Sequence, residues 1–467
     1  MKRNKSIVMV LMVLVVSLFM GCDMDMEIPP TGAIIDFGLE GQVGKAVINL
    51  ETETIQLPFP EAANLDKTNL EIIVLQVADF VEEITIDNEV VEVGKAFDFS
   101  SPVTLIVERK ELPDTEWTVI ISEETIDISG SGTEEEPFVI YTLAGLEELG
   151  ADDYPMDGHY QLGANIDATD TQDGDYNNGN GWEPIGEHGE EEFTGNFDGQ
   201  GYEITGLYID RADTEYVGLF SNLADTAVVS NLKLLNFDIT GNGRVGALAG
   251  INNGHINEVT VSSGQVTAAN HFRAGGLVGK NDGHDGNGLI EKSAAIDITV
   301  ISYHEFAGGL VGINFRGATI RECFSTGYVE SIDGGNNGNN FGGLVGGNHR
   351  SFIENSYTTV TVTARGNTGG LTGANVHGGL IEASYAVGAV NNEGENVGGL
   401  VGVSPPGAAN TVASYWDTET TGQDSSQGGT GKTTDQMQEQ DTFAQWDFEN
   451  IWDIDEGNTY PFLQWEN

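Results

Sequence analysis

A glycine-rich line with a leucine at its centre recurs in the second half of the chain, and it constrains the fold more than any other feature. The central leucines follow one another at steps of 29, 33, 34, 27 and 29 residues: Leu248, Leu277, Leu310, Leu344, Leu371 and Leu400. A repeat of this length indicates a solenoid, in which each copy is one rung that buries its apolar side against its neighbours. The five clear copies read AGGLVGKN, AGGLVGIN, FGGLVGGN, TGGLTGAN and VGGLVGVS, and VGALAGIN, at Val245, is a degenerate forerunner.

Columns of like residues accompany the leucines at fixed offsets. The residue before each leucine is Gly or Ala, and the leucines are expected to point inward. Glycine at this density weakens helices and suits β-turn rungs, whereas leucine-rich repeats demand several leucines and a helical arc. We therefore expect β rungs with an asparagine ladder four residues after the leucine and a serine–aromatic ladder further on. The first holds Asn252, Asn281, Asn314, Asn348 and Asn375, and the second holds Cys323-Phe324, Ser356-Tyr357, Ser384-Tyr385 and Ser414-Tyr415.

The repeat can be compared with a known family once the second strand of each rung is included. The glycine lines are followed by IRECFSTGYV, IENSYTTVTV and IEASYAVGAV. Together they resemble GLUG repeats from about Gly130 to the C-terminus, which implies a right-handed parallel β-helix as in bacterial adhesin-like proteins and the stalk of immunoglobulin A peptidases. Those peptidases carry a separate HExxH metalloprotease domain. Here His304-Glu305-Phe306-Ala307-Gly308 has glycine in place of the second histidine, so we expect no protease.

The first 21 residues have the pattern of a targeting segment. A basic start is followed by an apolar run from Ile7 to Met20 that is too short for an ordinary spanning helix. Gly21-Cys22 resembles the cleavage site of a bacterial lipoprotein signal, although Phe19 stands where Leu, Val or Ile is usual. We predict a signal peptide over 1–21, a lipidated Cys22, a tether over 22–31 and a surface-exposed protein attached to the cell envelope by its lipid alone. The alternative is an ordinary secretory signal with a free Cys22.

Residues 32–125 are expected to form a separate small domain. Short β-type runs separated by Gly, Pro, Asp and Asn predict a β-sandwich of about seven strands. The stretch from Phe97 to Ile121 resembles the closing half of immunoglobulin-like modules, which act as spacers. The fold class is therefore all-β, with a right-handed parallel β-helix preceded by a small β-sandwich.

The remaining boundaries follow from composition. Residues 130–200 are predicted to hold an N-terminal cap, with a strand from Pro137 and a short helix from Thr142, and the first rungs. Repeats occupy 201–415. The tail over 416–467 is rich in aromatic residues and is expected to close the far end.

Charge and cysteine content exclude some functions. The chain has 73 Asp and Glu against 19 Lys and Arg, a formal charge of −54. Such a surface repels phosphates, so nucleic acid is excluded as a partner, and the excess is consistent with solubility, a salty habitat or bound divalent cations. Two cysteines do not make a disulfide framework. Cys323 occupies a serine position of the repeat and is expected to be a buried filler.

A ridge four residues before the leucines is the candidate ligand-binding surface. If Phe220 aligns with the later leucines, the ridge contains Tyr216, Arg244, Arg273 and Phe306, and His271 and His304 lie two places earlier. Aromatic rings stack on sugar faces and guanidinium groups bind carboxylates, which suggests a contact for carbohydrate, including anionic sugars. The alternative is that the arginines pair with nearby acids and the histidines are solvated turn residues.

An Asp-rich loop is the candidate for calcium, the single cofactor considered. Asp173, Asp175 and Asn177 have the alternating spacing of an EF-hand loop. The sixth-position glycine is displaced to Gly179 and Pro184 stands in place of the acid at position twelve, so the pattern is weak.

These observations favour a non-catalytic surface stalk that binds extracellular carbohydrate or a protein of a host or neighbouring cell, with loops such as Asp333–Asn340 as contact points. A carbohydrate-active β-helix enzyme, a polysaccharide lyase or glycosidase, is the alternative, and a purely mechanical rod is a third. Paired carboxylates discriminate nothing in so acidic a chain, and a polyuronate lyase needs more cations than this chain offers.

Overall fold

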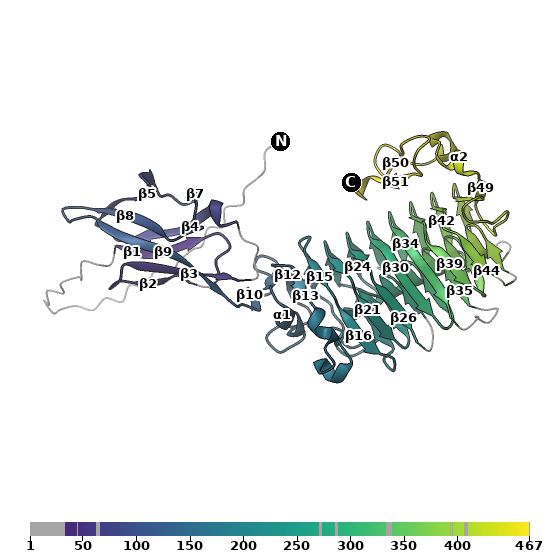
Figure 1. Ribbon diagram of the computed structural model, residues 1–467, viewed down its shortest axis with the longest axis horizontal. Helices are drawn as coiled ribbons and strands as arrows, with labels where there is room; N and C mark the ends of the chain where they lie inside the picture. The colour runs from purple at the N-terminus through teal and green to yellow at the C-terminus, as the bar shows by residue number, and fades with distance from the viewer. Residues whose placement is uncertain are drawn as a thin grey trace. The chain divides into compact units, whose positions relative to one another are not determined.

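The computed structural model describes residues 33–466 apart from 44, 62–65, 270–272, 285–287, 333–338, 393, 395 and 406–409. The predicted signal peptide, Cys22, the tether, His271 and most of the loop Asp333–Asn340 therefore lie outside the described residues. The chain divides into two compact units (Figure 1). The first comprises Met1–Pro58 and Asp66–Ser122, and the second comprises Glu123–Asn467 with Phe59–Leu65.

The first unit contains two sheets whose alternating side chains enclose a small core. Leu57, Leu105 and Trp117 are completely buried, because every second residue of their strands faces inward. One sheet has the order β1(Ile34–Leu39), β4(Leu70–Val77), β7(Ala96–Phe97), and a 3-10 turn, η1(Lys67–Asn69), precedes β4. The other has the order β2(Val47–Asn49), β3(Thr54–Pro60), β9(Thr115–Glu124), β8(Val103–Arg109), β5(Val81–Ile86), β6(Glu89–Val90).

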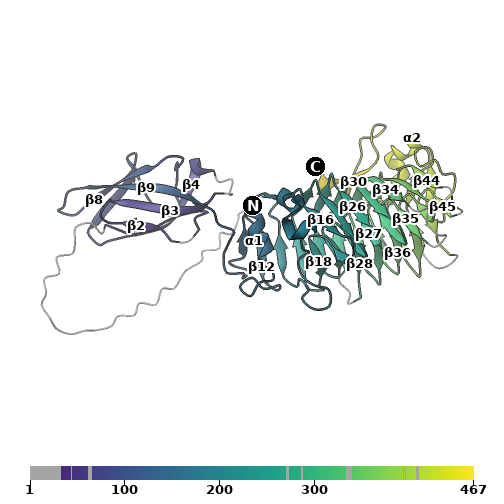
Figure 2. The same ribbon diagram turned by 60° about the horizontal axis from the view of Figure 1, so that its bottom comes forward.

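The second unit is a parallel β-solenoid, as the repeats predict. Each complete rung passes through four sides, and along each side successive rungs pair in parallel (Figure 2). The one antiparallel pair described in these four sheets is β10 with β11, at the start of the first side. The third and fourth sides contain seven strands each. The third side consists of β17(Tyr216–Val217), β22(Arg244–Val245), β27(Arg273–Gly275), β31(Phe306–Gly308), β35(Asn340–Gly342), β40(Asn367–Gly369) and β45(Val397–Gly398). The fourth consists of β18(Phe220–Leu223), β23(Ala249–Asn252), β28(Val278–Asp282), β32(Val311–Phe315), β36(Val345–His349), β41(Thr372–Val376) and β46(Val401–Val403).

The first and second sides are longer and extend to both ends of the solenoid. The first side contains β10(Ile128–Ser129), β11(Phe138–Ile140), β12(His159–Leu162), β14(Asn196–Asp198), β19(Val228–Ser230), β24(His255–Asn257), β29(Leu289–Glu291), β33(Thr319–Arg321), β37(Phe352–Glu354), β42(Leu380–Glu382) and β47(Asn410–Val412). The first half of the second side contains β13(Ile166–Asp167), β15(Glu203–Thr205), β20(Lys233–Leu235), β25(Thr260–Ser262), β30(Ala294–Ser302), β34(Phe324–Ser331), β38(Tyr357–Thr358), β43(Tyr385–Ala386), β48(Tyr415–Asp417) and β49(Thr430–Lys432). Its second half is formed by the ends of β30 and β34 with β16(Tyr208–Arg211), β21(Asp238–Gly241), β26(Gln265–Ala268), β39(Thr361–Ala364) and β44(Val390–Asn392).

The six marker leucines stack inside the solenoid, one rung above the next. All six are fully buried. The amide of Leu277 donates to the carbonyl of Leu310 at 2.9 Å, and the amide of Leu310 donates to Leu344 at the same distance. Each buried leucine contributes about 1.5–3 kcal/mol, so this column stabilises the stack more than any surface ion pair.

Glycine on both sides of the leucine lets the third and fourth sides approach each other through their backbones. A Cβ placed on Gly308, in β31, would lie 2.7 Å from the nitrogen of Gly346 in β36. A Cβ on Gly346 would in turn lie 2.7 Å from the nitrogen of Ala307. The recurrent glycines therefore mark a layer in which no side chain fits, which explains their fixed distance from the leucine.

The predicted asparagine ladder is present and fully buried. The side-chain amide of Asn281 donates to Asn314 at 3.0 Å, and that of Asn314 donates to Asn348 at 3.1 Å. Asn252 and Asn375 extend the ladder with bonds of 2.8 and 3.0 Å. The ladder therefore connects five successive rungs through hydrogen bonds along the solenoid axis.

The serine–aromatic columns also stack, and the aromatic rings lie outside the wall. The rings of Phe324, Tyr357 and Tyr385 are parallel, with centroids 5.0 Å apart at each step. Cys323 lies fully buried in the serine column, where its amide donates to the hydroxyl of Ser356 at 3.1 Å. Burial raises the pKa of its thiol to about 12, which makes it a filler rather than a nucleophile.

The first rung is covered by the expected strand and short helix. The helix α1(Leu143–Glu147) begins after Thr142, whose hydroxyl accepts a hydrogen bond from the amide of Gly145 at 3.1 Å. Leu146 is fully buried against the solenoid core. Two 3-10 turns, η2(Thr169–Gln172) and η3(Tyr176–Gly179), follow before the complete rungs begin.

The tail closes the far end with its first part only. Residues Thr418–Lys432 reach the last rung, where the hydroxyl of Ser426 accepts from the amides of Leu400 and Val401 at 3.2 and 2.8 Å. Beyond Thr433 the tail turns back along the outside of the second side (Figure 1). It includes α2(Thr434–Met437), η4(Gln440–Phe443), β50(Trp452–Asp453), β51(Phe462–Leu463) and η5(Gln464–Glu466).

The returning tail covers the outward aromatic column. The Trp465 indole donates to the carbonyl of Glu322 at 2.9 Å, and the Trp446 indole donates to Ala413 at 2.8 Å. The rings of Tyr385 and Trp452 lie 6.0 Å apart, centroid to centroid. The aromatic residues of the tail therefore cover the outward rings of the second side, in addition to closing the last rung.

Candidate functional site

The ridge residues form one column on the third side. Pairing between β17 and β22 places Tyr216 beside Arg244, and the next two pairs place Arg244 beside Arg273 and Arg273 beside Phe306. The alignment of Phe220 with the leucines is wrong, because Phe220 pairs with Ala249. The segment that joins the third and fourth sides is one residue shorter in this rung, from Tyr216 to Phe220, than in the next, from Arg244 to Ala249. Because the missing residue comes after Tyr216, the ridge residues stay in register.

The rings of the ridge are covered by side chains of the chain itself. The guanidinium carbon of Arg244 lies 5.1 Å from the centre of the Tyr216 ring, and the His188 ring lies 4.2 Å from it. The guanidinium carbon of Arg273 lies 5.7 Å from the Phe306 ring. These are cation–π distances. Neither ring is therefore an open platform for a sugar.

The arginines of the ridge have acidic neighbours. Arg244 forms an ion pair with Glu215 at 3.1 Å. Burial lowers the pKa of Arg273, with the positive charge of Arg244 adding to the effect and Glu305 opposing it. For Arg244, this geometry agrees with the alternative in which the arginine pairs with a nearby acid. The binding of a ligand by Tyr216, Arg244, Arg273 and Phe306 stays a prediction.

The histidine pair cannot be placed as a pair, since His271 is outside the described residues. His304 is half-buried in the bend before β31, and its carbonyl accepts a hydrogen bond from the hydroxyl of Ser302 at 2.7 Å. This bond fixes the turn that precedes Phe306.

A polar hollow of about 400 Å³ adjoins the ridge on the fourth side. Lys280 forms an ion pair with the buried Asp282, whose carboxylate also lies 3.7 Å from a guanidinium nitrogen of Arg316. The Arg316 guanidinium carbon lies 4.8 Å from the ring of Phe315. The cationic groups of Lys280 and Arg316 therefore share the carboxylate of Asp282, and Arg316 also lies against the Phe315 ring. This cluster was not predicted from the sequence, although Lys280 and Asp282 flank the predicted ladder residue Asn281.

A half-buried histidine, His349, lies on the same wall. Burial lowers the pKa of His349 to about 4, and the nearby His377 and Arg273 act in the same direction. The rings of His349 and Phe306 meet edge to face at 5.5 Å. His349 is therefore neutral at physiological pH and packs as an aromatic side chain.

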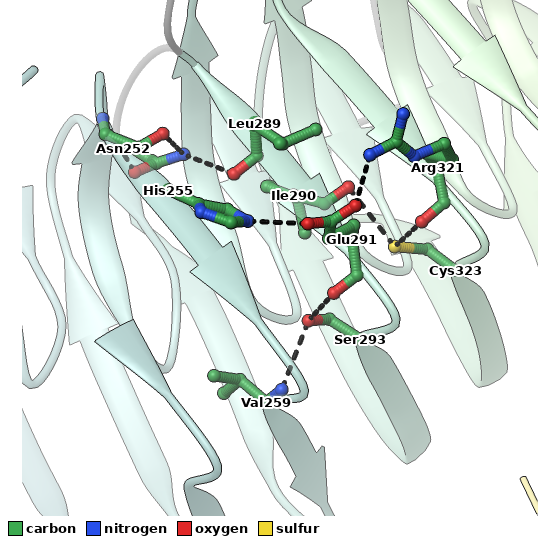
Figure 3. Close-up of polar contacts among 10 residues, drawn as sticks. Asn252, His255, Val259, Leu289, Ile290, Glu291, Ser293, Arg321 and Cys323 are labelled. Carbon is green, nitrogen blue, oxygen red and sulfur yellow. Dashed lines mark hydrogen bonds and ion pairs between the residues drawn. The ribbon is translucent and has the colours of Figure 1, made fainter. Parts of the chain in front are cut away.

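A charged column on the first side was also missed (Figure 3). His255 and Glu291, one rung apart, approach to 2.8 Å, and Arg321 of the following rung forms an ion pair with the same carboxylate. Burial acts to raise the pKa of Glu291, but the bonds from Arg321 and His255 outweigh it and the pKa lies below its usual value. The column continues to Glu354, whose pKa burial and the neighbouring Glu382 raise. Glu291, Arg321 and Glu354 each follow an inward isoleucine of the repeat, which is the signal for this column. His255 precedes its isoleucine and reaches Glu291 from the neighbouring column.

The loop proposed for calcium does not gather its candidate ligands into a cluster. The carboxylate of Asp173 accepts from the amide of Asp175 at 3.1 Å, and the side chain of Asn177 donates to the carbonyl of Gly181 at 3.0 Å. All three side chains are exposed. Among the described residues, no group of three or more His, Cys, Asp or Glu is placed to hold a metal ion.

Comparisons with known proteins add two relatives of related sequence. The chain is 36% identical over 352 residues to halomucin of Haloquadratum walsbyi (strain DSM 16790 / HBSQ001), a match that covers 73% of the chain and 3% of halomucin. It is 36% identical over 403 residues to a "Putative Gly-rich membrane protein" of Evansella cellulosilytica (strain ATCC 21833 / DSM 2522 / FERM P-1141 / JCM 9156 / N-4), covering 73% of the chain and 46% of that protein. The chain thus spans less than half the length of either relative.

No family model matches the chain, so the resemblance to GLUG repeats stays a prediction. Among solved structures, a crystal structure of a putative immunoglobulin A1 protease from Bacteroides ovatus is similar, with 20% identity and a TM-score of 0.48. That likeness covers 73% of the chain and 95% of the solved chain. In the described part of the chain, no helix is both long enough and apolar enough to cross a membrane.

Proposed function

We propose that the protein is a non-catalytic stalk of the bacterial cell envelope that presents the long sides of its solenoid to extracellular carbohydrate or protein. The asparagine ladder carries this proposal. It couples five rungs along the axis and so helps to hold the outer columns at a constant spacing. Eleven strands on the first side, at about 4.8 Å per strand, give a face roughly 50 Å long.

The arrangement of charged groups favours binding over catalysis. The clusters described above pair their charges with each other: Arg244 with Glu215, Lys280 with Asp282, and Arg321 with Glu291. General acid–base catalysis needs a side chain whose proton-donating or proton-accepting atom is accessible to the substrate. Here each of these carboxylates is already paired with a cation of the chain itself. The relative named as a membrane protein is consistent with a place in the envelope.

Attachment through a lipid on Cys22 is part of the proposal. The basic start, the apolar run and Gly21-Cys22 support it. Expression in a bacterial host with radiolabelled palmitate tests it. The native chain is expected to incorporate label and fractionate with membranes, and Cys22→Ser is expected to do neither. Equal labelling of the two chains would contradict lipidation at Cys22.

The binding role is tested by exposing the purified full chain to glycan and protein arrays and, in parallel, to soluble polysaccharides in a reducing-end assay. We expect retention on at least one ligand class without the appearance of new reducing ends. Depolymerisation of a polysaccharide would favour the enzyme alternative, and failure to bind either array would leave only a mechanical rod.

A further inference from the structure

The second half of the second side presents two outward columns of hydroxyl, amide, carboxylate and aromatic groups, which we call the threonine face. Their strands lie side by side across the solenoid in Figure 1. The intervening residues, such as Val266, Val300 and Val329, face the core and are buried. One column contains Tyr208, Asp238, Gln265, Thr299, Tyr328 and Thr361, and the other contains Asp210, Thr240, Thr267, Ile301, Glu330, Thr363 and Asn391.

The threonine face is rigid and regular. Its residues pair rung by rung from β16 to β44, so the Cα atoms of a column repeat at about the interstrand spacing of 4.8 Å. Threonine is β-branched and has few rotamers on a strand, which holds the hydroxyls in place. A ligand that lies along the solenoid axis would meet hydrogen-bonding groups at every rung.

Tyr328 is the exposed ring in the middle of this face. Its side chain is 62% exposed, the highest value among the large apolar side chains of the described chain. Thr299 and Thr361 flank it on the two neighbouring rungs and are partly exposed. An exposed ring between hydroxyl groups combines a flat apolar surface with hydrogen bonds around it, which suits the face and the edge of a sugar ring.

The first half of the same strands shows that this wall binds flat apolar groups. There the stacked rings of Phe324, Tyr357 and Tyr385 are covered by tryptophans of the returning tail. Phe324 and Tyr328 belong to the same strand, β34. The tail leaves the Tyr328 ring exposed, so this ring is open to a flat partner from outside the chain.

Charge decides which flat partner fits. The outward columns carry the carboxylates of Asp210, Asp238 and Glu330 and, among their described members, neither lysine nor arginine. Such a surface repels anionic polymers and accepts hydrogen bonds from hydroxyl groups. Resting on the proposed function, we propose that the threonine face binds a neutral polysaccharide chain that lies along the solenoid axis, with Tyr328 stacked on one of its sugar rings.

The test measures depletion of the purified full chain from solution by insoluble cellulose, xylan, mannan and chitin. Tyr328→Ala is expected to weaken binding to the retained polysaccharide about tenfold, and Tyr328→Phe is expected to restore it because the ring is kept. Phe352→Ala is the matched control, since Phe352 is an outward aromatic on the first side that is 36% exposed. It is expected to bind like the native chain. Thermal melting verifies that all variants fold.

The outcomes separate this inference from the proposed function. Native binding to a neutral polysaccharide that Tyr328→Ala leaves unchanged, or that Phe352→Ala weakens equally, would overturn the threonine face while the binding stalk stands. Binding to anionic pectin or alginate alone, to a protein, or to a second copy of the chain would also overturn it. A native chain that binds none of the glycans or proteins would contradict both proposals.

Discussion

Replacing Asn314 by alanine is expected to destabilise the solenoid by about 3 kcal/mol. The fully buried Asn314 amide donates to the Asn348 side chain at 3.1 Å and to the carbonyls of Phe352 and Ala318 at 3.0 and 3.3 Å, and its oxygen accepts from Asn281 at 3.0 Å. Each such bond contributes about 0.5–1.5 kcal/mol net, and buried groups that lose a partner cost more. Alanine removes these bonds, in which the two N–H groups of Asn314 share three acceptors, whereas the remaining carbonyl bonds of Asn281 persist.

Urea unfolding followed by tryptophan fluorescence and far-UV circular dichroism measures this effect. Asn391→Ala is the matched control, because that side chain is exposed and makes one bond of 3.4 Å, to Thr363. It is expected to change the free energy of unfolding by less than about 0.5 kcal/mol. Asn314→Asp, which cannot donate to Asn348 and buries a charge, is expected to be worse than alanine at neutral pH and to recover in part on acidification. If Asn314→Ala unfolds at the same urea concentration as Asn391→Ala, the ladder does not couple the rungs.

Three further predictions concern the glycine layer, His349 and the ridge. Gly308→Ala places a Cβ 2.7 Å from a backbone nitrogen and is expected to lower the free energy of unfolding by about 2–4 kcal/mol in the same assay. Gly174→Ala, which has open space around its Cβ, is expected to be neutral. Equal effects of the two substitutions would refute backbone contact between the third and fourth sides. The pKa of His349 is lowered to about 4 in the folded state, so protonation of this side chain destabilises the fold as pH falls from about 6.5 toward 4. Over that range, the free energy of unfolding of the native chain is expected to fall by up to about 3 kcal/mol relative to that of His349→Gln. A difference between the two chains that does not change with pH would contradict this prediction. The double variant Arg244→Ala, Arg273→Ala loses cation–π and ionic contacts and is expected to have a lower melting temperature but unchanged glycan retention. Loss of glycan retention at an unchanged melting temperature would instead support the ridge as the binding surface.

The fold followed from the sequence wherever a column repeats at a constant offset. Leu310 and Asn314 recur in each rung because each makes the same contact with its own counterpart, so the period revealed both the stacking and the inward direction. The register of the ridge was also predictable, since the strand that holds Arg273 is tied to the same marker. Phe220 was misaligned because its rung shortens the corner by one residue, a change that no spacing rule announces.

Contacts between columns could not be predicted in the same way. That Arg244 lies over the Tyr216 ring depends on side-chain direction and on the His188 loop, which comes from outside the repeat. The return of the tail over Tyr385 likewise depends on which side of the last rung the chain leaves. The threonine face was overlooked for a different reason: its members vary in type from rung to rung, and only their shared outward direction groups them.

Distances between spin labels along one outward column test the central claim, that successive glycine–leucine lines are stacked rungs of one solenoid. In a Cys22→Ser background, with Cys323 protected by burial, cysteine pairs at Thr240 with Thr363 and at Thr240 with Asn391 are four and five rungs apart. Pulsed dipolar spectroscopy is expected to give narrow distributions near 19 and 24 Å, one interstrand spacing apart. Broad distance distributions, or two mean distances that differ by much more than about 5 Å, would contradict the stacking of the rungs.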